Sequence, residues 1–215
     1  MEPVTLEEAK TWYVDADPVH DFDHVLRVYR IAERLAIAEG ADLDIVRAAA
    51  LLHDSRGSAP GIAGNSRMEH HITSAHFAGS VLAEKGWPEE RIKAVQHCIL
   101  THRYRGHEEA PQTIEAKVLF DADKLDVLGA IGAARTIAYA ALENQPFFSE
   151  PSQQFLLTGE KQPGEPHSSY HEFLFKLRHV KDRMFTQSGK AMAKSRYAYL
   201  MDFYKQLRAE VHGER

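Results

Sequence analysis

The sequence contains two histidine–aspartate pairs, and only one lies where chemistry is expected. His53-Asp54 follows the apolar run 48–52 at the end of an expected helix. An aspartate at that end opposes the helix dipole, and burying a carboxylate beside an imidazole is costly unless the two are paired or bind a metal ion. His20-Asp21 instead begins a helix, where Asp21 serves as an N-cap. We therefore take His53-Asp54 as the candidate site, with a buried ion pair as the alternative.

Two further residues can reach this pair. His24 lies in an amphipathic stretch, 21–39, which a short turn at 40–41 joins to the segment that ends at His53. Helices joined by so short a turn pack antiparallel, so His24 can lie opposite His53. Asp123 is one of three acids within six residues of an otherwise apolar stretch. Three carboxylates cannot all be solvated there while the stretch faces a core, so we expect one of them to meet a cation.

The elements that position these residues are expected to be helices. Apolar residues recur mostly every three and four positions, and Thr5-x-x-Glu8 is a capping box that starts the first helix. With 44% hydrophobic and 27% charged residues over 215 positions, the composition is that of a globular protein. We predict an all-α protein of one domain, 1–215, comprising a metal-site core at about 18–142, a loop or lid at 143–167 and C-terminal helices at 168–212.

The segment 143–167 interrupts the helical pattern, because it contains four of the nine prolines. A tolerant surface insertion is the slightly favoured interpretation. The alternative is a lid that closes over the candidate site and excludes water from it, with Phe147 and Phe148 stacking on a ring of the bound ligand.

The composition excludes several classes of partner and site. A net charge of −5 without a dense run of Lys or Arg argues against binding of duplex nucleic acid. A single cysteine, Cys98, excludes an internal disulfide and a multi-thiolate metal site, so any metal ligands are His, Asp or Glu. No stretch approaches the roughly 20 apolar residues of a membrane-spanning helix, and the N-terminus is too polar for a secretory signal. We expect a cytoplasmic protein with no membrane partner.

The order His24, His53-Asp54, Asp123 resembles that of the HD-domain superfamily of metal-dependent phosphohydrolases. The resemblance extends along nearly the whole chain. Within the superfamily, the sequence is similar to the bacterial YedJ-type HD hydrolases. The stretches that carry it are 20–28, 51–54, 97–102, 121–132 and 184–196. It implies an all-α HD-domain helical bundle with a C-terminal helical extension.

The resemblance also implies one divalent metal ion, held by His24, His53, Asp54 and Asp123. Two imidazoles and two carboxylates leave two positions of a six-coordinate ion open, and such mixed ligation suits Mn, Mg, Fe or Ni better than a closed zinc site. A bound metal lowers the pKa of water from about 15.7 to about 7, so that hydroxide can attack phosphorus. We expect His53, Asp54 and Lys124 to be the catalytic residues.

Phosphoryl transfer also needs positive charge around the oxygens of the transferred group. For most basic residues a solvated surface charge is the more common role, whereas the two interpretations balance for Lys124 because its neighbours are apolar. His97 and His102 are five positions apart, about 140° around a helix, so a phosphate contact is easier than a shared metal. The candidate substrate-binding residues are Arg56, His97, His102, Lys124 and Lys176.

The expected function is hydrolysis of a phosphate ester or anhydride of a small phosphorylated metabolite. A nucleotide is the leading candidate, cleaved as by a nucleotide pyrophosphohydrolase or a 5′-nucleotidase. One alternative is a dinuclear-iron oxygenase on the same fold, which requires a second metal ion and additional histidines. We expect most histidines outside the candidate site, His70 among them, to be surface or packing residues, whereas His20 is left open as a residue that supports the metal site. The other alternative is an inactive nucleotide-binding module, against which the complete set of four ligands argues. The oligomeric state is not predicted.

Overall fold

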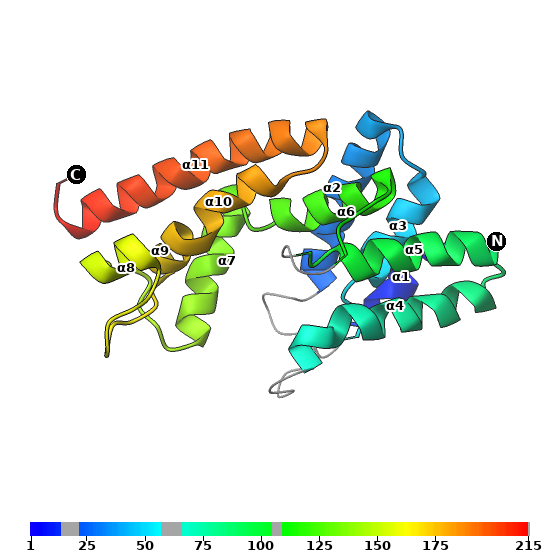
Figure 1. Cartoon of the computed structure of the whole chain (residues 1–215), viewed down its shortest axis with the longest axis horizontal. Helices are drawn as coiled ribbons and strands as arrows, with labels where there is room; N and C mark the ends of the chain where they lie inside the picture. Colours follow the sequence, from blue (N-terminus) through cyan, green and yellow to red (C-terminus); the bar gives the residue numbers. More distant parts are fainter. Residues whose placement is uncertain (14–21, 57–65, 105–108, 215) are drawn as a thin grey trace. The chain divides into compact units, whose positions relative to one another are not determined.

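A computed structural model of the chain describes residues 1–13, 22–56, 66–104 and 109–214. Within these residues the secondary structure is helical and contains no β-strand, so the all-α prediction is confirmed (Figure 1). The chain forms two compact units. Unit 1 comprises Met1–Asp123 and Phe185–Gly189, and unit 2 comprises Lys124–Met184 and Lys190–Arg215. The organisation of 1–215 as one domain stays a prediction.

Unit 1 is built around α3, which contacts α1, α2, α4 and α5. The apolar sequence of α3 explains its central place, since seven of its ten residues are buried. The capping box predicted at Thr5 is present at the start of α1. The helices of this unit are α1 (Leu6–Lys10), α2 (Phe22–Glu39), α3 (Leu43–Leu52), α4 (Ser66–Glu84), α5 (Glu89–Thr101) and most of α6 (Ile114–Leu125).

The turn between α2 and α3 is formed by residues that favour it. Gly40 adopts a φ of 70°, a left-handed conformation that ends α2. Asp42 then caps α3 by accepting hydrogen bonds from the backbone of Asp44 and Ile45. The same carboxylate is held by Arg91 of α5 at 2.8 Å. This turn fixes where α3 begins, and with it the place of the residues that follow its last turn.

Unit 2 packs around aromatic rings. Phe173 and Tyr204 stack with centroids 4.4 Å apart, and both are buried. The carbonyl of Leu125, at the end of α6 and near the start of this unit, accepts a hydrogen bond from the side chain of Arg196. Its helical elements are α7 (Gly129–Leu142), α8 (Gln153–Thr158), α9 (Ser169–Glu172), the π-helical turn η1 (Phe173–Leu177), α10 (Arg178–Val180), the 3₁₀ turn η2 (Lys181–Arg183) and α11 (Gln187–Val211) from Lys190 onward.

The segment 143–167, expected as a loop, contains the short helix α8. Phe147 is exposed, but Phe148 stacks on Tyr170 with centroids 5.1 Å apart, so its ring already packs within unit 2. A lid role for this segment stays a prediction.

The described part of the chain has no single helix that is both long and apolar enough to cross a bilayer, although the bent pair α6 and α7 meets those criteria when taken together.

Candidate metal centre

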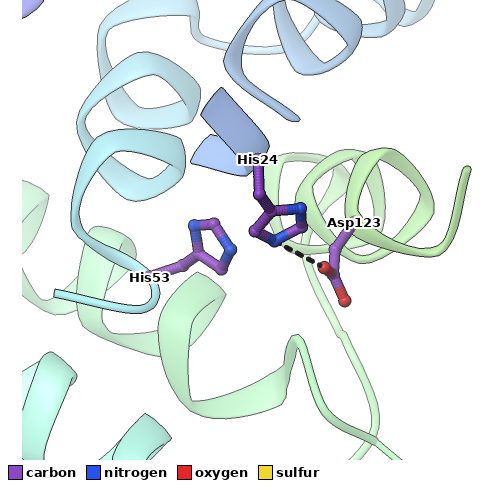
Figure 2. A group of neighbouring side chains, drawn as sticks. All are labelled: His24, His53 and Asp123. Carbon is purple, nitrogen blue, oxygen red and sulfur yellow. Dashed lines mark ion pairs between the residues drawn. The ribbon is translucent and has the colours of Figure 1, made fainter. Parts of the chain in front are cut away.

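Three residues far apart in the sequence meet in unit 1. His24 comes from α2, His53 follows the last residue of α3, and Asp123 comes from α6. Each offers one ligand atom, and these atoms lie within 4.8 Å of one another. Figure 2 shows the carboxylate of Asp123 directed at the ring of His24, with 3.6 Å between Oδ1 and Nε2. The sequence predicted that these residues are ligands of one metal ion, and the structure places them around one point.

Asp54, the fourth predicted ligand, faces the same space. Its Oδ2 lies 3.5 Å from Nε2 of His53 and 3.8 Å from Nε2 of His24. Burial by itself raises the pKa of this carboxyl, but the surrounding imidazoles, with His53 foremost, outweigh burial and hold the pKa well below its usual range. Asp54 is therefore a carboxylate at neutral pH.

The end of α3 is fixed by three side chains that cap its last carbonyl groups. Such carbonyls have no partner within their own helix. Tyr13 donates to the carbonyl of Leu51 at 2.9 Å, and Ser55 donates to that of Leu52 at 2.8 Å. Nδ1 of His53 completes the set by bonding to the carbonyl of Ala50 at 2.8 Å. These contacts set both the backbone position and the ring orientation of His53.

The bond to Ala50 also settles which nitrogen of His53 carries the proton. A carbonyl can only accept, so Nδ1 must be the donor, and Nε2 of the neutral ring is left with a lone pair. The side chain is fully buried, and among the described residues Nε2 has no hydrogen-bond partner. It faces Oδ2 of Asp54, a second acceptor. Because two buried acceptors that face each other are costly, this donor set fits a divalent cation.

A second group gathers around the other oxygen of Asp54. Nε2 of His70 lies 3.0 Å from Oδ1, and Nε2 of His102 lies 3.4 Å from it. Nδ1 of His102 is bonded to the carbonyl of Ile99 at 2.6 Å, and burial lowers the pKa of His102 to about 4. The ring is thus neutral at neutral pH. His70 was expected to be a surface or packing residue; the structure corrects this, because α4 brings its ring against Asp54.

Arg103 determines which nitrogen of the neutral His70 ring carries the proton. Its Nη1 lies 3.1 Å from Nδ1 of His70, and a guanidinium can only donate. Nδ1 is therefore the acceptor, and the proton of the neutral ring is on Nε2, which faces Asp54 Oδ1. Residues that orient a metal ligand in this way are typical of metal sites. In this arrangement His70 presents an N–H group to Asp54, not a lone pair to a metal.

The other predicted substrate-binding residues have partners of their own. The guanidinium of Arg56 lies over the ring of Phe77, 3.7 Å from its centroid. His97 belongs to neither group of possible ligands in the described part of the chain; its Nε2 accepts from the backbone of Gln112 at 3.2 Å. In unit 2, Lys176 pairs with Glu172 at 2.8 Å, and Lys124 begins that unit. Their roles toward a substrate stay predictions. His20 and Asp21 lie outside the described residues.

Comparison with known proteins decides the family. Residues 21–128 match the family model described as "HD domain". The chain belongs to the HD-domain family. The Bacillus subtilis (strain 168) protein described as "Uncharacterized protein YpgQ" is 30% identical to this HD-domain chain over 96% of its residues and 94% of the relative. The predicted resemblance to the HD-domain superfamily is confirmed.

Two solved structures extend this result to the fold. The Bacillus subtilis YpgQ structure in complex with ADP is 27% identical, with a TM-score of 0.72 over 96% of this chain and 98% of that chain. An HD-superfamily hydrolase from Bacillus thuringiensis is 28% identical, with a TM-score of 0.68 over 96% of each chain. The present HD-domain chain is accordingly a metal-dependent hydrolase of the same superfamily.

Proposed function

We propose that this protein hydrolyses a phosphate ester or anhydride of a small phosphorylated metabolite, and that the metabolite is a nucleotide. The observation that carries the proposal is the buried lone pair of His53 Nε2, which faces the carboxylate of Asp54 beside His24 and Asp123. That set of donors fits one divalent ion, for which Mn, Mg, Fe and Ni are the candidates. The ADP bound to the related YpgQ supports a nucleotide as substrate.

When bound, such an ion supplies a water molecule of lowered pKa and polarises a phosphoryl oxygen. The chain's own part is to hold the ligands in place. The carbonyl of Ala50 orients His53, and the N–H of His70 faces Oδ1 of Asp54, which leaves Oδ2 directed toward His53. We propose that Lys124 neutralises charge that develops on the phosphoryl oxygens. We assign Arg56, His97, His102 and Lys176 to contacts with the substrate.

A dinuclear-iron oxygenase is the competing function, and the group Asp54, His70 and His102 is the observation that favours it. Arg103 argues against it. While its guanidinium donates to Nδ1 of His70, Nε2 of that ring carries a proton and has no lone pair for a second ion. One metal ion is therefore the better fit.

The test is metal analysis of the purified protein, followed by a hydrolysis screen over nucleotides and other phosphate esters with Mn²⁺, Mg²⁺ and Ni²⁺. We expect about one divalent ion per chain and metal-dependent turnover. Pyrophosphate released from a nucleoside triphosphate indicates attack at the α-phosphorus, whereas free phosphate from a monophosphate indicates a nucleotidase. Two irons per chain with consumption of oxygen would replace the proposal, and nucleotide binding without turnover would favour an inactive binding module.

A further inference from the structure

The chain returns to unit 1 for five residues, Phe185–Gly189, between two parts of unit 2. This segment is bonded to the buried carboxylate of Asp121. Oδ1 of Asp121 accepts from the backbone of Phe185 at 2.9 Å. Oδ2 accepts from both the backbone and the hydroxyl of Thr186, at 2.8 and 2.7 Å. Asp121 is fully buried, so these hydrogen bonds to a charged acceptor are of the strong kind.

The segment packs closely around this carboxylate. The hydroxyl of Thr186 also accepts from the backbone of Gly189 at 2.9 Å. A Cβ on Gly189 would overlap Oδ2 of Asp121, so only glycine fits there. The ring of Phe185 meets the ring of Phe120 edge-on, with centroids 5.0 Å apart.

The same segment is bonded to a second helix. The backbone of Ser188 donates to Oε1 of Glu39 at 2.7 Å, and Glu39 is the last residue of α2. Asp121 belongs to α6. The segment therefore connects the helix that carries His24 to the helix that carries Asp123.

Asp121 and Asp123 are two positions apart on α6, about 200° around the helix axis. One carboxylate can thus face the segment 185–189 while the other faces His24. Any rotation or shift of α6 that lengthens the bonds of Asp121 also moves the carboxylate of Asp123, which lies 3.6 Å from His24.

We propose that residues 185–189 form a clamp that positions Asp123 against His24, with Asp121 and Thr186 as its positioning residues. The inference rests on the proposed function, because it gives the clamp a role at the metal site. Displacement of a ligand by about 1 Å is enough to weaken such a site. Loss of the clamp should therefore weaken metal binding by more than an equal loss of hydrogen bonds elsewhere in the protein.

The test compares Thr186→Val with Thr136→Val. Both substitutions keep the shape of a buried threonine and remove its hydroxyl, and the hydroxyl of Thr136 donates to the carbonyl of Gly132 in unit 2 at 2.7 Å. Binding of Mn²⁺ to the full chain is measured by titration calorimetry, with thermal unfolding recorded alongside. We expect about tenfold weaker Mn²⁺ binding for Thr186→Val, the scale of effect seen for residues that orient metal ligands, and unchanged binding for Thr136→Val.

Two further variants make the test independent of a folding defect. Thr186→Ser retains the hydroxyl and should restore binding to within about twofold of the wild type, since the bond to Asp121 is kept. Glu39→Ala removes the bond to Ser188 without touching the buried carboxylate and should also weaken binding.

Wild-type affinity in Thr186→Val, or an equal loss in Thr136→Val, would overturn the clamp while leaving the proposed function in place. A wild-type protein that binds none of Mn²⁺, Mg²⁺, Fe²⁺ and Ni²⁺ would overturn the metal site itself, and the role of the clamp with it.

Discussion

His53 and His102 are held in the same tautomer by the same contact. Each ring bonds through Nδ1 to the carbonyl three residues earlier, at 2.8 and 2.6 Å, and each residue is the C-cap of its helix. Their Nε2 atoms approach opposite oxygens of Asp54, at 3.5 and 3.4 Å. In the neutral form of each ring Nδ1 carries the proton, so that Nε2 offers a lone pair toward the carboxylate. The lone pair of His53 belongs to the proposed site for one divalent ion, whereas we assign His102 to a contact with the substrate.

His53→Ala and Asp54→Ala should each abolish metal binding and activity while leaving the helical content largely intact. Each removes a ligand atom that the remaining side chains cannot replace. The measurements are bound metal per chain and far-ultraviolet circular dichroism. His171→Ala is the control, because it removes a fully buried histidine of unit 2 and should retain the metal. Full metal occupancy in either site variant would contradict the assignment.

Arg103→Ala should weaken Mn²⁺ binding by about tenfold without changing the number of ions bound. Removal of the guanidinium frees His70 to change tautomer, so that Asp54 Oδ1 no longer faces a fixed N–H group. Titration calorimetry measures both the affinity and the stoichiometry. Arg47→Ala, which breaks an ion pair with Glu33 in the same unit, serves as the control and should bind Mn²⁺ normally.

His70→Ala tests the number of metal ions bound per chain, measured by the same titration. If His70 acts by orienting Asp54, this variant binds the same number of ions as the wild type, but more weakly. A fall from two bound ions to one would show instead that His70 is a ligand of a second metal, and would favour the oxygenase.

Local sequence signals predict the helical fold and bring His24, His53 and Asp123 to one candidate site, but they do not predict the contacts that support these residues. Gly40 and Asp42 mark the turn between α2 and α3, and the apolar run before His53 places that residue at a buried helix end. His70 is different. It lies 16 positions after Asp54, beside His71, and the sequence pattern does not set which of the two adjacent rings α4 directs at the carboxylate.

The three acids at and directly after the end of α6 show the same limit. The sequence indicates that the three carboxylates cannot all reach solvent if this stretch faces a core. The structure gives each of them a different partner. Asp121 accepts from backbone groups more than 60 positions away, Asp123 approaches His24, and Asp126 pairs with Arg135 at 2.6 Å. Asp126 thus meets a cation in the form of a guanidinium, while the role of Asp123 as a metal ligand stays a prediction. Long-range pairing of this kind depends on tertiary packing, which periodicity does not encode.

Gly189→Ala should destabilise the protein by about 1–3 kcal/mol, because the added methyl group overlaps the carboxylate of Asp121 and forces a shift in a packed region. Gly79→Ala is the matched control. There the new methyl group meets the end of the flexible side chain of Gln96, and alanine favours a helix, so a smaller loss is expected. Urea unfolding of the two variants measures the difference. Wild-type stability in Gly189→Ala would show that the clamp can accommodate a methyl group beside Asp121.

Glu165 should make the stability of unit 2 depend on pH. Its carboxylate accepts from the backbone and hydroxyl of Ser152 and from the backbone of Gln162, each at 2.7 Å, and it lies 3.1 Å from Nε2 of His171. The backbone N–H of Ser152 contributes most, and together these donors lower the pKa of Glu165 from 4.5 to about 2, against the opposing effect of desolvation.

Because the folded-state pKa lies below the unfolded-state pKa, the unfolded chain binds more protons between these values. The contribution of Glu165 to stability is then complete above pH 4.5 and is lost as the pH falls toward about 2. Urea unfolding at pH 5 and pH 3 should show a smaller loss of stability for Glu165→Gln than for the wild type. Glu160→Gln, at an exposed position of the same segment, should behave as the wild type does. An equal loss in all three proteins would show that these donors do not stabilise the ionised form of Glu165.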